Sequence, residues 1–155
     1  MAFVYRFATL LRLALHEEGE VKNRLAVKDG QIAAEEAKIQ KVVKEREEAF
    51  ADQARDLMTG SMERIRMYPL YLQRLGKTQA FYEDELQRLR SQRQKILNDL
   101  AEKRRRRKIF EKLRERDEKR YQKKELKRDQ KQMDEFAARS ASHDRNKDDH
   151  PGRDE

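Results

Sequence analysis

The sequence contains no cysteine and few of the residues that reverse or break a chain. Without cysteine there is no disulfide framework, no thiolate metal site and no cysteine nucleophile. Glycine occurs 5 times and proline 2 times in 155 residues, so sharp chain reversals must be rare. No apolar run approaches the roughly 20 residues that cross a bilayer. These absences point away from a disulfide-rich secreted scaffold and from a membrane-spanning protein.

Apolar residues are also scarce. They make up 36% of the chain, whereas charged residues make up 44%. A compact domain usually has about a quarter of its residues charged. The apolar residues are too few to fill a three-dimensional core, but a two-helix coiled coil needs them at only about two positions in seven. Disorder is the competing interpretation of this composition, and the periodicity described below favours helix over disorder.

The N-terminal stretch, residues 3–15, is the most apolar part of the chain. Arg6 and Arg12 interrupt it, and no small-residue cleavage site follows. We therefore interpret it as helix and not as a signal peptide. The lack of cysteine fits a reducing compartment, so the chain is expected in the cytoplasm.

A seven-residue repeat runs through the second half of the chain. Its members are Ile65, Tyr68, Leu72, Leu75, Gln79, Tyr82, Leu86, Leu89, Arg93, Ile96, Leu100, Lys103, Arg107 and Phe110. This spacing predicts one face of a coiled coil. The first half repeats less cleanly, with one frame through Phe7, Leu11, Ala14, Val21, Leu25, Ile32 and Ile39. Val43, Phe50 and Leu57 continue that frame only after a predicted slip of one position near residue 40.

One site suits a chain reversal, Thr59-Gly60-Ser61. Gly60 suits the left-handed conformation that ends a helix, and Ser61 suits the cap of the next one. If the chain folds back there, the numbers of facing residues sum to about 121. The facing pairs then include Leu11 and Phe110, Val21 and Leu100, Ile32 and Leu89, and the opposite charges Glu18 and Lys103. The predicted fold is all-α, an antiparallel two-helix coiled-coil hairpin over residues 1–141.

The two helices predicted by this turn differ in length. The second passes the N-terminus of the first, so residues beyond about 120 are expected to overhang as a single helix. The charged tail, residues 142–155, is expected to be disordered. Pro69 should either kink the second helix near the turn or begin its main part as the first helical residue.

The chain offers no arrangement of residues suited to catalysis. The three histidines, His16, His143 and His150, are isolated from one another and from any metal-ligand spacing. Glycine-rich phosphate loops and nucleophile elbows are missing. We therefore predict no enzymatic activity, no metal and no cofactor.

Positive charge is concentrated in residues 103–128, which hold 15 Lys or Arg and 5 Asp or Glu. A basic helix of this kind can meet nucleic acid, an anionic membrane surface or an acidic protein, or it can simply be solvated. Nucleic acid is disfavoured because the basic segment follows the coiled coil and contains only two aromatic residues, Phe110 and Tyr121. No nucleic-acid partner is predicted.

Apolar residues in excess of the coiled-coil repeat occur in two places. Near the turn, Leu70, Tyr71 and Phe81 lie off the repeat and should be exposed, where they either bind a protein or pack on the kinked turn. Toward the open end of the hairpin the N-terminal stretch has more apolar surface than a seam uses, carried by Phe3, Tyr5, Phe7, Leu10, Leu11 and Leu13. Met133 and Phe136 lie on a strongly charged C-terminal segment with no evident partner helix. Both places are expected to bind other proteins.

Three segments of the chain are distinctive: residues 3–13 (FVYRFATLLRL), residues 68–75 near the turn (YPLYLQRL) and residues 129–139 (DQKQMDEFAAR). Together they resemble the flagellar FliJ family. The resemblance implies a cytoplasmic component of the flagellar type III export apparatus, peripherally associated with the inner face of the cell membrane. Members of the family form an antiparallel coiled coil that docks into the ring of the export ATPase and promotes its assembly and activity. They also contact the cytoplasmic domain of the membrane export gate and handle export chaperones.

Residues can be assigned to two of these partners. The surplus apolar residues at both ends of the chain would dock the ATPase, namely Phe3, Phe7, Leu10, Leu11, Met133 and Phe136. By resemblance the gate-facing patch would be Val42, Tyr71, Leu75, Thr78 and Tyr82. Glu45 and Ala49 stand in a region where the family has aromatic residues. Three alternatives stay open: the equivalent stalk protein of a virulence-type secretion system, a nucleic-acid-binding basic helix, and a purely structural spacer.

Overall fold

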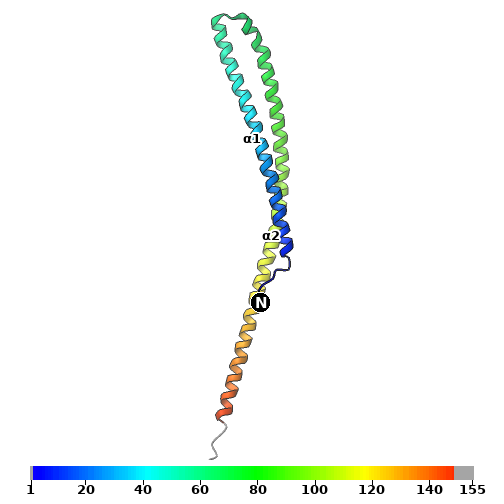
Figure 1. Cartoon of the computed structure of the whole chain (residues 1–155), viewed down its shortest axis with the longest axis vertical. Helices are drawn as coiled ribbons and strands as arrows, with labels where there is room; N and C mark the ends of the chain where they lie inside the picture. Colours follow the sequence, from blue (N-terminus) through cyan, green and yellow to red (C-terminus); the bar gives the residue numbers. More distant parts are fainter. Residues whose placement is uncertain (1, 149–155) are drawn as a thin grey trace, which may run out of the picture. The chain divides into compact units, whose positions relative to one another are not determined.

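The structure is a computed structural model that describes residues 2–148, and their side chains as far as residue 142. Over that range the chain forms two helices, α1 (Ala8–Thr59) and α2 (Met62–Asp148), and no strand. It divides into two compact units. One is a hairpin, Leu13–Arg106, in which α1 and the first part of α2 lie side by side (Figure 1). The other combines the first 12 residues with α2 from Arg107 onward. The predicted all-α hairpin is confirmed.

The turn between the helices lies at the predicted residues. Gly60 has a φ of 78°, the left-handed conformation that glycine adopts without strain. The amides of Gly60 and Ser61 both donate to the carbonyl of Asp56, at 2.9 and 3.3 Å, and so satisfy the end of α1. The carbonyl of Ser61 accepts the Ile65 amide at 3.1 Å, which starts the hydrogen bonding of α2. A glycine-dependent cap therefore reverses the chain.

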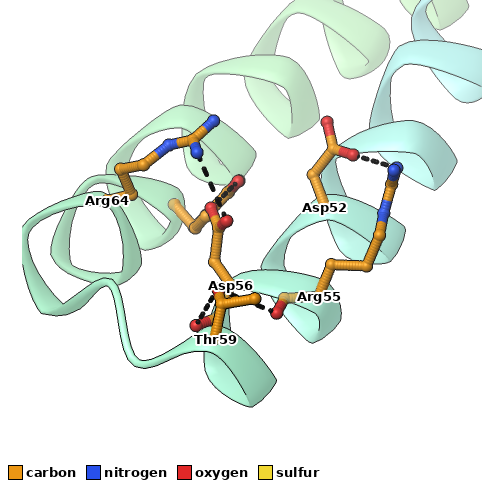
Figure 2. A network of polar contacts seen from close by, with 6 residues as sticks. Asp52, Arg55, Asp56, Thr59 and Arg64 are labelled. Atoms are coloured by element: carbon orange, nitrogen blue, oxygen red, sulfur yellow. Dashed lines mark hydrogen bonds and ion pairs between the residues drawn. The ribbon is translucent and has the colours of Figure 1, made fainter.

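A buried carboxylate fastens this turn to the start of α2. Asp56 accepts a 2.7 Å hydrogen bond from the hydroxyl of Tyr68 and lies 3.5 Å from the guanidinium of Arg64. Figure 2 shows Arg64 pointing toward Asp56, while Arg55 pairs with Asp52 one turn earlier. The hydroxyl of Thr59 also bonds the Asp56 carbonyl at 3.2 Å. The last turn of α1 and the first turns of α2 are thus joined by polar contacts.

The predicted slip in the first helix is wrong. The inward side of α1 in the hairpin follows one uninterrupted frame, whose members are all buried or half-buried: Ala14, Glu18, Val21, Leu25, Lys28, Ile32, Glu35, Ile39, Val42, Arg46, Ala49, Gln53 and Asp56. Phe50 and Leu57, which the slip placed inside, are 51% and 60% exposed. Polar residues occupy part of the true frame, so the pattern of apolar residues did not reveal it. These polar side chains can face the other helix because they have partners there: Arg46, for example, donates to Gln79 at 2.7 Å.

The frame of α2 agrees with the predicted repeat. Every repeat position from Ile65 to Lys103 is buried or half-buried, with Leu75, Leu86 and Leu100 the most deeply placed. Pro69 lies inside α2, so it does not begin the helix as one alternative proposed. The line along which the two frames meet is called the seam below.

Ion pairs across the seam support the predicted register. Arg24 pairs with Asp99 at 2.7 Å and Arg93 with Asp29 at 2.6 Å. Lys103 pairs with Glu17 at 3.1 Å, one position from Glu18, the partner that the register predicts. Lys28, which the register set against Arg93, instead donates to Gln92 at 2.8 Å. Like charges are therefore kept apart by the choice of neighbouring partners.

In the second unit the N-terminal segment packs along α2. Tyr5 is buried, and its hydroxyl donates to the carbonyl of Phe110 at 2.9 Å. The rings of Phe3 and Tyr121 lie 5.7 Å apart. Burial is the main cause of a raised pKa for Tyr5, with a further contribution from Asp117 and opposing ones from Arg6 and Arg114.

The overhanging helix is also present. From Leu126 to Ser142 every side chain is exposed, as expected of a helix without a partner. α2 continues to Asp148, beyond the expected start of the disordered tail at residue 142. The hydroxyls of Ser140 and Ser142 bond to carbonyls of the preceding turn, which lets serine remain in helix there. The remainder of that predicted tail, residues 149–155, lies outside the described residues. In the described part of the chain, neither helix has a stretch apolar enough to cross a bilayer.

Candidate partner-binding surfaces

The first candidate surface is a stripe on α2 near the turn, beside the seam. It consists of Met67, Leu70, Tyr71, Arg74, Thr78 and Phe81, which at 100° per residue fall within about 100° of arc. All six side chains are exposed. The predicted exposure of Leu70, Tyr71 and Phe81 is confirmed. We call this the tip-proximal stripe.

The stripe borders a hollow of about 440 Å³. Its lining combines apolar and cationic groups: Arg64, Arg66, Met67, Tyr68, Leu70, Tyr71 and Arg74. On its other side, Tyr71 lines a smaller hollow of about 130 Å³ together with the acidic residues Glu45, Glu48 and Asp52 of α1. Tyr71 therefore stands between a basic and an acidic depression, a setting in which one ring can contact a partner carrying either charge.

The residues assigned to the export gate divide into three groups by exposure. Tyr71 and Thr78 lie on the tip-proximal stripe, and the Thr78 hydroxyl is occupied by the carbonyl of Arg74 at 3.0 Å. Val42 and Leu75 are buried in the seam. Tyr82 is half-buried, with the ammonium of Lys38 5.5 Å from its ring centre. Only the first group presents its side chains freely to a partner.

The second candidate surface lies in the unit that contains both chain ends. Leu11 is buried there, while Phe3 and Phe7 are half-buried. Phe7 stacks edge-on against Tyr5 at 5.9 Å and carries the guanidinium of Arg6 at 4.4 Å from its ring centre. Leu10 is exposed. The N-terminal residues thus serve partly as internal packing and partly as surface.

The most accessible apolar side chains of this unit are on the overhanging helix. Met133 is 74% exposed and Phe136 is 77% exposed. They line one side of α2 with Asp129, Gln132, Glu135 and Arg139. Large apolar side chains so placed on a charged helix are typical of a protein contact. We call Phe3, Phe7, Leu10, Met133 and Phe136 together the terminal surface. It has two separate parts, because Phe3 packs at Tyr121 and Met133 lies roughly 18 Å farther along α2.

Some exposed apolar residues were missed by the sequence analysis. Met58 and Met62 flank the turn and are both exposed. Phe50 and Leu57 belong with them on the surface of the hairpin, as described above. The frame of α1 continued without a slip could have found Phe50, Leu57 and Met58, because each then falls off the seam. Met62 lies on α2, off the predicted repeat that starts at Ile65. Groups of three or more histidine, cysteine or carboxylate side chains placed to hold a metal do not occur among the described residues.

Comparison with known proteins gives one match. The family model described as the flagellar FliJ protein matches residues 3–146, which is nearly the whole chain. Neither the curated proteins nor the solved structures gave a match. The extent of the family match agrees with the helical hairpin and with the three resembling segments. The chain therefore belongs to the FliJ family and is a protein related to flagellar export.

Proposed function

We propose that this chain is the coiled-coil stalk of the flagellar export apparatus in the cytoplasm, at the inner face of the cell membrane. Its terminal surface docks into the ring of the export ATPase and promotes the assembly and activity of that ring. Its tip-proximal stripe contacts the cytoplasmic domain of the export gate, and the chain also handles export chaperones. Family membership supports the assignment to flagellar export. The exposed apolar side chains on both surfaces support the proposal that each surface binds a different partner.

The observation that carries the docking proposal is the exposure of Met133 and Phe136. Burying two such side chains in a partner would contribute several kcal/mol, at about 1.5–3 kcal/mol for each large apolar side chain. Phe3 and Phe7 contribute less directly, because the packing with Tyr5 and Tyr121 already covers part of their rings. Leu11 acts through the fold, since it is buried.

The docking proposal is tested by replacing Met133 and Phe136 with alanine in the full chain. The turnover of the purified export ATPase is then measured with and without each protein. We expect the double variant to lose most of the stimulation seen with the wild type. The matched control replaces Val27 and Phe50, two exposed apolar residues of the hairpin. Full stimulation by the Met133→Ala, Phe136→Ala protein, with helicity intact, would show that docking lies elsewhere.

The gate proposal rests on the tip-proximal stripe. Tyr71 and Phe81 are its exposed aromatic members, and aromatic residues are frequent anchors of protein interfaces. Tyr71→Ala with Phe81→Ala should weaken binding to the gate domain at least tenfold, measured by titration calorimetry. Leu75→Ala and Val42→Ala are less informative because both side chains are buried in the seam and their loss also loosens the hairpin. Unaltered affinity of the Tyr71, Phe81 variant would exclude the stripe as the gate contact.

A further inference from the structure

Among the cations of residues 103–128, two groups have different surroundings. Those near the seam are neutralised within the hairpin: Lys103 and Arg106 pair with Glu17 at 3.1 and 3.2 Å, and Arg104 with Glu18 at 3.5 Å. Farther along α2 a second group has no such partners. Neither the docking of the ATPase nor the gate contact uses that second group.

The second group forms a line. Lys108, Lys112, Arg116, Lys119, Lys123 and Lys127 follow one another in steps of three or four residues, and all six side chains are exposed. At 100° per residue they fall within about 100° of arc, along roughly 28 Å of helix. None of the six has a hydrogen bond or ion pair with the described residues. We call this line the cationic stripe.

The arc that contains the cationic stripe holds few residues of any other kind. The other residues within it are Ile109 and Leu126, one near each end, and both are exposed. No carboxylate falls inside the arc, and Glu115 lies just outside its edge. The N-terminal segment packs on the opposite side of α2, where Tyr5 bonds the carbonyl of Phe110 and Phe3 meets Tyr121. The stripe is therefore free of the intramolecular packing of its own unit.

We propose that the cationic stripe binds the surface of a membrane containing anionic lipids. Five of its six cations are lysines, which act as point charges on flexible stems, whereas arginine is preferred for bidentate contacts to carboxylates. The centres of protein interfaces are poor in lysine. A straight line of cations meets a flat anionic surface with all members at once, while a duplex backbone winds away from it. Ile109 and Leu126 lie where they can enter the headgroup layer.

This proposal rests on the proposed function in one respect: the proposed function puts the chain at the inner face of the cell membrane, where the stripe would meet anionic lipids. Lipid binding is measured on the full chain alone, without ATPase or gate protein, so the two proposals can fail separately. The probe is vesicles of phosphatidylcholine and phosphatidylglycerol in equal parts, with pure phosphatidylcholine vesicles as the neutral comparison. The readout is the fraction of protein that sediments with the vesicles.

The decisive variant is Lys112→Gln with Lys119→Gln and Lys123→Gln. Its matched control is Lys41→Gln with Lys77→Gln and Lys95→Gln, three exposed lysines of the hairpin that also lack ion-pair partners among the described residues. Both proteins lose three positive charges. We expect the first to lose roughly a hundredfold in its partition to anionic vesicles, and the control to stay within about twofold of the wild type. Lys→Arg changes at 112, 119 and 123 should retain binding.

Circular dichroism verifies that each variant keeps its helices. If the stripe variant and its control lost vesicle binding equally, the binding would depend on net charge alone and the proposal would be overturned. Equal binding of the wild type to neutral and anionic vesicles would overturn it as well. The proposal would also be overturned if the wild type bound neither kind of vesicle but bound a single-stranded oligonucleotide through the same lysines, because the partner would then be nucleic acid.

Discussion

At the scale of single residues, the turn depends on one carboxylate. Asp56 is buried, accepts from Tyr68 and faces Arg64, and its backbone carbonyl caps α1. A buried acid on an apolar frame would ordinarily destabilise a helix pair. Here each of its oxygens has a partner, so the acid fixes how the two helices meet at the turn. The sequence pattern offered no sign of this role, because an aspartate four residues before a glycine is ordinary composition near a turn.

The hydroxyl of Tyr68 gives this network a dependence on pH. Its pKa is raised above the ordinary value of 10.0, first by the hydrogen bond to Asp56, then by burial and by the charges of Asp56 and Asp52, with Arg64 acting in the opposite sense. A raised pKa in the folded state means that the contact stabilises the fold below pH 10 and is lost as the pH rises through the folded-state value.

Tyr68→Phe is therefore expected to lower the melting temperature at neutral pH and to reduce the further decline above pH 10. Thermal unfolding followed by circular dichroism from pH 7 to pH 11 measures both effects. Tyr71→Phe is the control, because that exposed hydroxyl has no hydrogen-bond partner among the described residues. Identical pH profiles for the Tyr68→Phe protein and the wild type would contradict the assigned role of the hydroxyl.

At the scale of elements, the turn requires a residue in the left-handed conformation. Gly60→Ala forces a Cβ into that region at φ 78° and should cost about 1 kcal/mol of stability. Gly60→Asn should cost less, since asparagine tolerates this conformation better. Chemical denaturation gives both values. No loss in the alanine variant would mean that the chain reverses in another way in solution.

The two helices also differ in how much of their frame the sequence revealed. In α2 the seam positions are mostly apolar to Leu100, and the predicted repeat agreed with the observed burial. In α1 the seam includes Glu18, Lys28, Arg46 and Asp56, each with polar partners. A pattern of apolar residues alone could not follow that frame, and it favoured Phe50 and Leu57 instead. The hydrogen bonds that make these polar positions tolerable depend on the partner helix, which one helix's sequence does not show.

The corrected frame makes a stability prediction. Leu100→Ala removes a side chain buried in the seam and should cost about 2–3 kcal/mol, the low end for a buried leucine because the seam is narrow. Phe50→Ala should change stability by no more than about 0.5 kcal/mol, as expected of a surface position. Urea titration of the two variants compares them directly. If Phe50→Ala lowered the free energy of unfolding more than Leu100→Ala, Phe50 would lie in the seam and the predicted slip would be right.

At the scale of the whole molecule, the sequence was most informative about fold and family and least about which residues are free to bind. The helices of the hairpin and the exposure of Leu70, Tyr71 and Phe81 followed from periodicity, and the turn followed from the residue types of Gly60 and Ser61. Periodicity also placed Leu11 and Leu75 on the seam, yet both were assigned, with Val42, to partner surfaces, and all three side chains are buried. Partner contacts are selected by what remains exposed after folding, and that depends on the register of both helices.

The central claim is that two separate surfaces bind two different partners. Its most direct measurement is photo-crosslinking in flagellated cells that express this chain in place of their own family member. A photoreactive phenylalanine analogue replaces Phe136, Phe81 or, as a control, the exposed Val27. We predict that Phe136 crosslinks to the export ATPase, that Phe81 crosslinks to the cytoplasmic domain of the export gate, and that Val27 gives neither product. Crosslinking of Phe136 and Phe81 to one and the same partner, or of neither to any export component, would contradict the account.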